Sequence, residues 1–127
     1  MLTLRGMLAL ADAALDEQER ELLDRFVAAL REEYGRDLDA VWLYGSRARG
    51  ERAHVESDID VLVITGSGRD DERLIPILWR VLDELGNPQV LVDPRQRSRA
   101  WVEDRRAIDS FFLRDLDRDK VVLYSRS

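Results

Sequence analysis

A glycine-rich turn between two apolar segments constrains the fold of this chain more than any other feature. Leu38–Tyr44 is rich in β-forming residues and ends at Gly45, and a second such segment spans residues 58–64. Apolar runs of this length, bounded by glycine and polar residues, are typical of buried strands. The sequence therefore predicts two strands joined through a turn, with a short helix from Ser46 to about Gly50.

Helical spacing of apolar residues flanks these two strands. Asp16–Tyr34 and Leu74–Leu85 carry apolar residues three and four positions apart, the period of an amphipathic helix. The remaining segments are predicted as a strand at Gln89–Val92, a largely helical stretch at Arg95–Leu116 and a last strand at Val121–Tyr124. Helices and strands therefore alternate. Core positions are expected at Trp42, Trp79, Trp101, Ile108, Phe112 and Leu116.

The length, composition and charge of the chain limit the classes of protein to which it can belong. Its 127 residues fit a single domain, 1–127, in which residues 1–14 are an N-terminal arm or a helix extension. The absence of cysteine excludes a disulfide framework, a zinc–thiolate site and a cysteine nucleophile. The net charge of −6 argues against general nucleic-acid binding. No apolar run is long enough to cross a bilayer, so we expect a cytoplasmic protein.

The turn Gly45–Gly50 has the composition of an anion site. Gly45 lets a ligand approach the backbone, and Ser46 can cap the next helix and offer its hydroxyl to a phosphate oxygen. Amides at a helix start attract anions, and Arg47 and Arg49 add charge that can reach phosphates. The alternative is a capped strand-to-helix turn with solvated arginines.

Two carboxylates open the second strand. Asp58 and Asp60 are two residues apart, so their side chains point to the same face of a strand. Neighbouring carboxylates repel unless a cation lies between them, and oxygen ligands suit Mg²⁺ or Mn²⁺. The alternative is that both aspartates are solvated at the polar start of the strand.

In combination, these features resemble a known family. Gly45–Gly50 with Ser57–Val63 strongly resembles the nucleotidyltransferases of the polymerase-beta-like superfamily in their minimal, single-domain form. Val41–Tyr44 before the turn and Asp119–Tyr124 near the end also match, and the resemblance extends from about residue 20 through most of the chain.

The resemblance implies an α/β (α+β) fold with a small mixed sheet of about four strands packed by helices. It implies that Gly45 and Ser46, with Arg47 and Arg49 nearby, hold the triphosphate of a donor such as ATP. Asp58 and Asp60 would bind the metals. The reaction would transfer a nucleoside monophosphate to an acceptor and release pyrophosphate.

One departure from the family concerns a third carboxylate on the next strand. In our alignment this position falls at or next to Val90, which cannot bind metal or activate an acceptor. Asp93 is the nearest acid and is a candidate catalytic residue if a bulge or twist brings it round. The alternative is that Asp93, which precedes Pro94, caps the next helix. Arg95, Arg97 and Arg99 then face either the triphosphate, a negatively charged partner or solvent.

The resemblance also suggests an acceptor. Minimal members are frequently paired with a helical HEPN-type protein in toxin–antitoxin arrangements, and an acidic chain is compatible with a basic partner. The leading hypothesis is an adenylyl-transferring antitoxin that acts on that partner. A catalytically weak or inactive domain that neutralises by binding is the second. The third is an enzyme modifying a small molecule such as an aminoglycoside, with a homo-oligomer forming the pocket.

Overall fold

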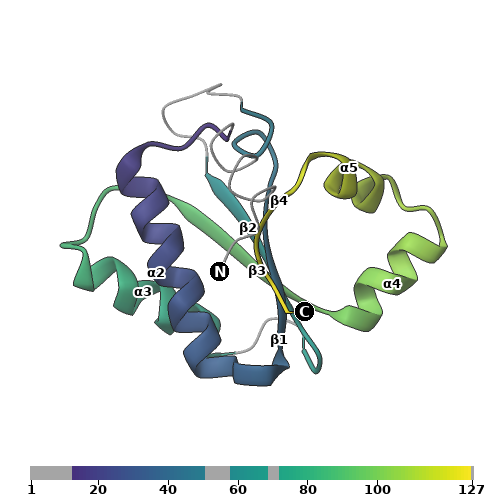
Figure 1. Cartoon of the computed structure of the whole chain (residues 1–127), viewed down its shortest axis with the longest axis horizontal. Helices are drawn as coiled ribbons and strands as arrows, with labels where there is room; N and C mark the ends of the chain where they lie inside the picture. The colour runs from purple at the N-terminus through teal and green to yellow at the C-terminus, as the bar shows by residue number, and fades with distance from the viewer. Residues whose placement is uncertain (1–12, 51–57, 69–71, 127) are drawn as a thin grey trace.

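A four-stranded mixed sheet separates two layers of helices in the computed structural model, which describes residues 13–50, 58–68 and 72–126 (Figure 1). The strand order is β3-β2-β1-β4. Strand β1 pairs antiparallel with both β2 and β4, whereas β2 and β3 are parallel. The mixed sheet predicted from the family resemblance is therefore confirmed. The strands are β1 (Leu38–Tyr44), β2 (Ile59–Thr65), β3 (Val92–Ser98) and β4 (Val121–Ser125).

The helices cover both faces of this sheet. Helices α2 and α3 lie on one face, and α4 and α5 lie on the other (Figure 1). A single 3₁₀ turn, η1, connects α2 to β1. The bounds are α2 (Glu17–Tyr34), η1 (Gly35–Asp37), α3 (Leu74–Glu84), α4 (Arg99–Ala107) and α5 (Phe111–Asp119).

Helix α2 begins and ends at sequence signals that are visible in the chain. The Asp16 side chain accepts a hydrogen bond from the Glu19 amide at 2.7 Å, and the Glu19 carboxylate accepts one from the Asp16 amide at 2.9 Å. This reciprocal pair is a capping box, which satisfies amides that the helix itself leaves without partners. Gly35, with φ of 55°, closes the helix in a conformation that favours glycine.

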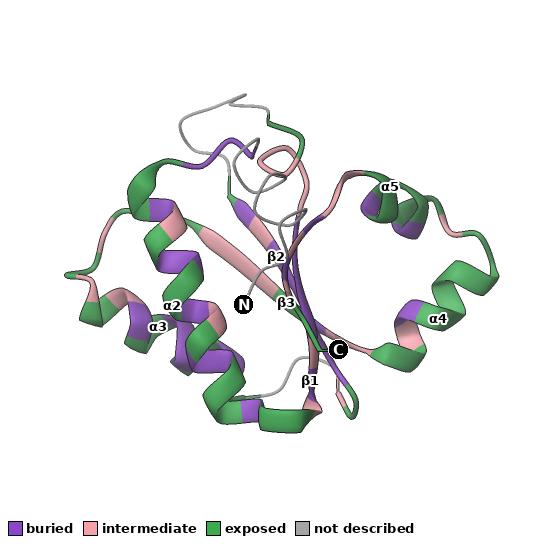
Figure 2. Cartoon of the chain, in the orientation of Figure 1, coloured by how far each residue is buried: buried purple, intermediate pink, exposed green. Residues whose placement is uncertain are grey.

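Alternate residues of the central strands supply two separate cores. Val41, Leu43, Val61 and Val63 pack toward α2 and α3. The intervening residues pack toward α4 and α5, where they contact Val102, Leu113 and Leu116; these are Ala40, Trp42, Leu62 and Ile64. Figure 2 shows the buried stripes of the helices turned toward the sheet. Burial on both faces explains why β1 and β2 are apolar runs.

Ion pairs hold the α4–α5 hairpin together and against the sheet. Arg106 donates two hydrogen bonds to Asp117, at 2.8 and 2.7 Å, and this pairing, with Lys120, lowers the pKa of Asp117 to about 2. At the start of α4, the Arg99 guanidinium donates to both carboxylate oxygens of Asp39 in β1. These bidentate contacts fix the helices over one face of the sheet.

Most elements follow the sequence prediction, with three corrections. The predicted strand at Gln89–Val92 is wrong, because β3 begins at Val92 and occupies the start of the stretch predicted as helical. The short helix expected from Ser46 is a run of turns. Trp79, Ile108 and Phe112 were expected in the core but are 65%, 67% and 44% exposed. Most of the predicted arm, residues 1–12, lies outside the described residues.

Candidate active site

Two aspartates face each other across the parallel strands β2 and β3. Asp60 and Asp93 are register partners, each the second residue of its strand. Partners in a parallel ladder project from the same face of the sheet, which here is the face that carries α4 and α5. Asp58 lies just before β2 and is exposed. The strand pairing therefore brings Asp93 beside the two carboxylates that the sequence pattern singled out.

The electrostatics of Asp60 reflect this grouping. Burial raises the pKa of the Asp60 carboxyl most, and the negative charges of Asp93 and Asp58 raise it further, while Arg95 opposes them. Like charges raise a carboxyl pKa only when they lie near it. The three carboxylates thus form one interacting group where β2 and β3 begin.

Asp93 does not cap the following helix in the structure. Asp93 lies inside β3, and α4 is capped by Ser98, whose hydroxyl oxygen accepts a hydrogen bond from the Trp101 amide at 3.0 Å. Val90, where we had placed the third position, precedes β3 and packs against the core on the α2–α3 side. β3 begins at Val92, three residues later than predicted, so the acid in register with Asp60 is Asp93.

Gly45 approaches Asp60 closely. Tyr44 is the register partner of Asp60, so the chain leaves β1 directly beside that carboxylate. Gly45 has φ of +78°, and a Cβ atom there would lie 2.4 Å from Asp60 Oδ2. Only glycine combines this conformation with this approach. The turn backbone and the carboxylate group therefore share one end of the sheet.

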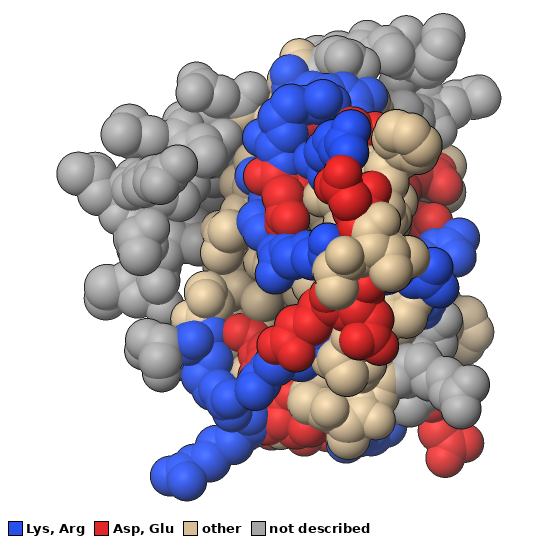
Figure 3. Space-filling model, turned by 90° about the vertical axis from the view of Figure 1, so that its right-hand side faces the viewer, with Lys and Arg blue, Asp and Glu red and all other residues tan. Residues whose placement is uncertain are grey.

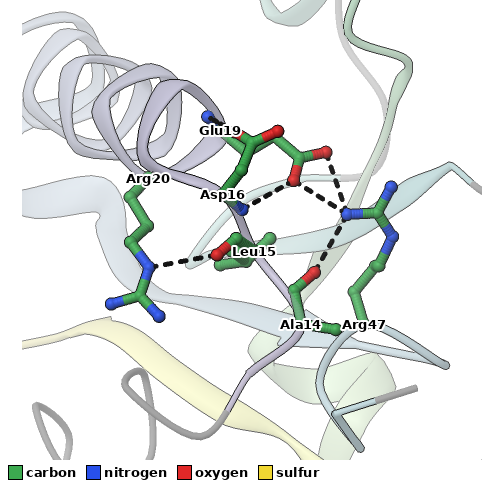
Figure 4. Close-up of polar contacts among 6 residues, drawn as sticks. All are labelled: Ala14, Leu15, Asp16, Glu19, Arg20 and Arg47. Atoms are coloured by element: carbon green, nitrogen blue, oxygen red, sulfur yellow. Dashed lines mark hydrogen bonds and ion pairs between the residues drawn. The ribbon is translucent and has the colours of Figure 1, made fainter. Parts of the chain in front are cut away.

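Arg47 connects the turn to the start of α2 (Figure 4). Its Nη1 donates to the Ala14 carbonyl and to both Glu19 carboxylate oxygens, each at 2.9 Å. The Ala14 amide donates back to the Arg47 carbonyl at 2.8 Å. The Arg47 and Glu19 side chains are only 11% and 10% exposed. The structure thus engages this guanidinium within the protein, and the predicted contact of Arg47 with phosphate stays a prediction.

The other turn residues remain close to the carboxylate end of the sheet. Ser46 is half-buried, and the Arg49 amide donates to the Gly45 carbonyl at 3.3 Å. Gly45 and Arg49 line a small cavity of about 190 Å³ against α5. Arg49 also lies near Asp119. The pKa of the Asp119 carboxyl is lowered mainly by its hydrogen bond with Arg118, and the charge of Arg49 contributes to this lowering.

A larger cleft of about 480 Å³ opens between the sheet and the α4–α5 hairpin. Asp60 and Asp93 lie in its wall, so it borders the carboxylate group. The other residues that line it are Tyr44, Leu62, Arg95, Arg97, Trp101, Arg105, Ser110 and Phe112. Volumes of this size accommodate small-molecule ligands. Sequence reasoning placed Arg95 and Arg97 at a helix start and did not single out Tyr44, Arg105 or Ser110.

A family model described as "Nucleotidyltransferase domain" matches residues 23–122, which include the turn and all three aspartates. The chain belongs to this family. No curated protein sequence matches it. Membership makes the molecule a nucleotidyltransferase and confirms the resemblance drawn from the turn and the paired aspartates.

Two solved structures resemble this nucleotidyltransferase domain. One is the crystal structure of a toxin–antitoxin with AMP-PNP, at 16% identity and a TM-score of 0.51, covering 82% of this chain and 74% of the other. The second is a "putative nucleotidyltransferase" from Sulfolobus solfataricus, at 20% identity and a TM-score of 0.47, covering 98% and 91%. The first shares the fold of this chain. No helix among the described residues is long and apolar enough to span a membrane.

The donor set of this nucleotidyltransferase suits a hard divalent cation. Asp58 and Asp60 offer carboxylate oxygens, and the repulsion that raises the Asp60 pKa is what a cation would relieve. Within the described ranges, no three acidic or histidine side chains form a ready metal cage. Mg²⁺ is commonly held by one or two carboxylates together with substrate phosphates and water. The residues present therefore fit a metal that arrives with a nucleotide.

The raised pKa of Asp60 predicts a pH-dependent loss of folding stability in the protein without bound metal. A carboxyl whose pKa is raised in the folded state destabilises that state when the carboxyl is ionised, at pH values above the folded-state pKa. It has no such effect when it is protonated, at pH values below its ordinary pKa of 3.8. Asp60→Asn should therefore have a higher Tm than the wild type at neutral pH without metal, and this difference should close on acidification. Thermal scans across pH measure it, and a lower Tm for the variant at neutral pH would contradict it.

The Arg47–Glu19 pair predicts a loss of stability. Arg47→Ala leaves the Glu19 carboxylate buried without its cation, which costs about 3 kcal/mol of unfolding free energy. Urea denaturation followed by circular dichroism measures this difference. Arg25→Ala, which removes an exposed arginine paired with Glu21 on α2, should change stability by about 0.5 kcal/mol or less. Equal effects of the two substitutions would show that the buried pair is unimportant.

Proposed function

We propose that this nucleotidyltransferase transfers AMP from ATP to a protein acceptor in the presence of Mg²⁺ or Mn²⁺. The observation that carries the proposal is the pairing of Asp60 with Asp93 beside Gly45, which groups the acidic residues and the turn at one end of the sheet. This arrangement supports a site for a metal–nucleotide complex and an attacking hydroxyl.

Each residue has a distinct role in the proposed transfer. The Gly45 backbone, the Ser46 hydroxyl and Arg49 hold the triphosphate, and Arg47 keeps the turn in place through Glu19. Asp58 and Asp60 hold the metal, which when bound neutralises charge on the phosphates. Asp93 accepts the proton of the acceptor hydroxyl. The acceptor oxygen bonds to the α-phosphorus, the bond from that phosphorus to the bridging oxygen breaks, and pyrophosphate leaves with the electron pair.

A helical HEPN-type toxin is the proposed acceptor and partner. The fold likeness to a toxin–antitoxin crystallised with AMP-PNP supports this context. The net charge of −6 supports association with a basic surface. A cytoplasmic location and a homo-oligomeric state stay predictions.

Neutralisation by binding alone remains the alternative to be tested. It was motivated by the valine at the expected third position; the register of Asp93 with Asp60 supports the transferase over this alternative. Modification of a small molecule is a further alternative. No specific observation favours it over transfer to a protein.

Label transfer decides among these functions. The protein is incubated with Mg²⁺, its co-purified partner and ATP labelled at either the α- or the γ-phosphate. Transfer of AMP moves α-label, and no γ-label, to the partner. Asp93→Asn should slow the transfer, whereas the control Asp83→Asn on α3 should not. Neutralisation of the partner without any label, unchanged in Asp93→Asn, would refute the transferase and support the binding alternative.

A further inference from the structure

Arginines outnumber carboxylates in the cleft between β3 and the α4–α5 hairpin. Arg95, Arg97 and Arg105 line it, against the two carboxylates of Asp60 and Asp93. We propose that this cleft binds an acidic segment of the protein acceptor, next to the hydroxyl that receives the nucleotide. This inference rests on the proposed function and deepens it: the acceptor, whose wider surface is proposed to be basic, presents an acidic segment at this cleft.

The position of the cleft follows from the strand order. The turn at Gly45 ends β1, whereas Asp93 lies on β3, on the other side of β2. In an in-line displacement the attacking and leaving oxygens lie on opposite sides of the α-phosphorus. With the leaving pyrophosphate at the turn, the acceptor approaches from the β3 side. The cleft extends from Asp93 along Arg95 and Arg97 beneath α4, so it lies along that approach.

The arginines in this cleft are held in place by neighbouring side chains. The guanidiniums of Arg97 and Arg105 lie 5.6 and 5.4 Å from the centre of the Trp101 ring, within cation–π range. Arg95 Nε lies 3.6 Å from Asp93 Oδ2, so it borders the proposed proton acceptor. Guanidinium groups bind carboxylates through two parallel hydrogen bonds. An acidic peptide is therefore matched in charge, and its carboxylates are the acceptors that guanidinium donors suit.

The aromatic residues of the cleft favour a peptide over a nucleic acid. A stacked base needs an open ring face, but the Trp101 ring already contacts two guanidiniums, and the Phe112 ring lies edge-on to it at 6.2 Å. Phe112 is also edge-on to Tyr44 at 5.8 Å. The rings position the arginines and each other, so recognition depends on charge.

The outer surface of the hairpin lacks this charge bias. Basic and acidic side chains are interspersed over this side of the molecule (Figure 3). Many are paired with each other, such as Arg106 with Asp117 and Arg114 with Asp109. The cleft thus differs from the outer face of the hairpin in its charge, and a segment bound in it would meet the carboxylate group.

Binding of fluorescent peptides tests the inference directly. A short peptide of alternating glutamate and serine is compared, at low salt and with Mg²⁺ and the donor analogue α,β-methylene-ATP, whose α–β linkage cannot be cleaved, with the same peptide carrying glutamine for glutamate. The wild type should bind the acidic peptide about tenfold more tightly, as measured by fluorescence anisotropy. Arg97→Gln with Arg105→Gln should remove this preference. Arg97→Lys with Arg105→Lys should retain part of it, and Arg25→Gln on the opposite helical layer should retain all of it.

Three results would overturn the inference. One is equal binding of the acidic and neutral peptides by the wild type. Another is a preference that survives the double glutamine variant when circular dichroism shows that variant folded; if it does not fold, Arg105→Gln, at an exposed position of α4, takes its place. The third is tighter binding of a single-stranded oligoadenylate than of the acidic peptide.

The same assays separate this inference from the proposed function. Asp83→Asn on α3, outside the cleft, should retain both the peptide preference and the transfer of label. A wild type that prefers the acidic peptide but transfers no label contradicts the proposed function. A wild type that transfers label but shows no acidic preference contradicts the inference alone.

Discussion

Replacing Asp58 and Asp60 together by asparagine is expected to abolish nucleotide transfer while the protein stays folded. Asparagine keeps the size of the side chain but removes the two negative charges that would hold the metal. Loss of the charge that stabilises the transition state lowers a rate by about 10³-fold or more. The initial rate of α-label transfer to the partner measures the loss. Circular dichroism and thermal melting establish that the fold survives, as expected because Asp58 is exposed and ionised Asp60 destabilises the fold.

A double control separates this effect from a general change of charge. Asp24→Asn with Asp83→Asn removes two exposed carboxylates from α2 and α3, on the opposite side of the sheet. This variant should transfer label at the wild-type rate. Transfer that continues undiminished in the Asp58 and Asp60 variant would refute the site, and an equal loss in the control would attribute the effect to net charge.

The elements that the sequence predicted are those specified by local patterns. The capping box at Asp16 and Glu19, the glycine after α2 and the doubly buried strands β1 and β2 all leave signals within a few neighbouring residues. These signals placed the turn and the two leading aspartates at one end of the sheet. The positions of the turn and of these two aspartates in the fold could therefore be predicted without a structure, and their joint action as a site stays a prediction.

Strand β3 could not be predicted in this way because its signal is tertiary. It contains Pro94, which sheets tolerate on edge strands, and β3 lies at the edge of the described sheet. Gln96 is fully buried; its side-chain Nε2 donates to the Thr65 hydroxyl at 3.1 Å, and its side-chain Oε1 accepts from the Tyr34 hydroxyl at 3.4 Å. These contacts and the hydrogen bonds to the parallel strand β2 stabilise the strand conformation of this polar segment. The alternation of Asp93, Arg95 and Arg97 was the one local hint.

The role of Arg47 was equally hidden from the sequence. Its partner Glu19 lies 28 residues earlier, and no spacing rule links a turn to the first turn of a preceding helix. Charge alone suggested a phosphate contact. The guanidinium fastens the turn to α2 through Glu19, and its contact with phosphate stays a prediction.

Gly45→Ala is expected to reduce transfer by about 10²-fold, because it displaces the central carboxylate of the site. The new Cβ atom would lie 2.4 Å from Asp60 Oδ2, far inside contact distance, so either the Asp60 side chain or the turn must move. The residue also has φ of +78°, where an alanine costs about 1–2 kcal/mol. The rate of α-label transfer and the free energy of unfolding are measured on the same preparation.

A second glycine separates these two effects of the substitution. Gly86 has φ of +80°, but nothing lies within 4 Å of a Cβ atom built there. Gly86→Ala should therefore lose a similar amount of stability to backbone strain and keep its transfer rate. If the loss of transfer rate in both variants is proportional to their loss of unfolding free energy, the close approach of Gly45 to Asp60 is not required for catalysis. If Gly45→Ala alone loses transfer, the close approach of the turn to the carboxylate is what the reaction requires.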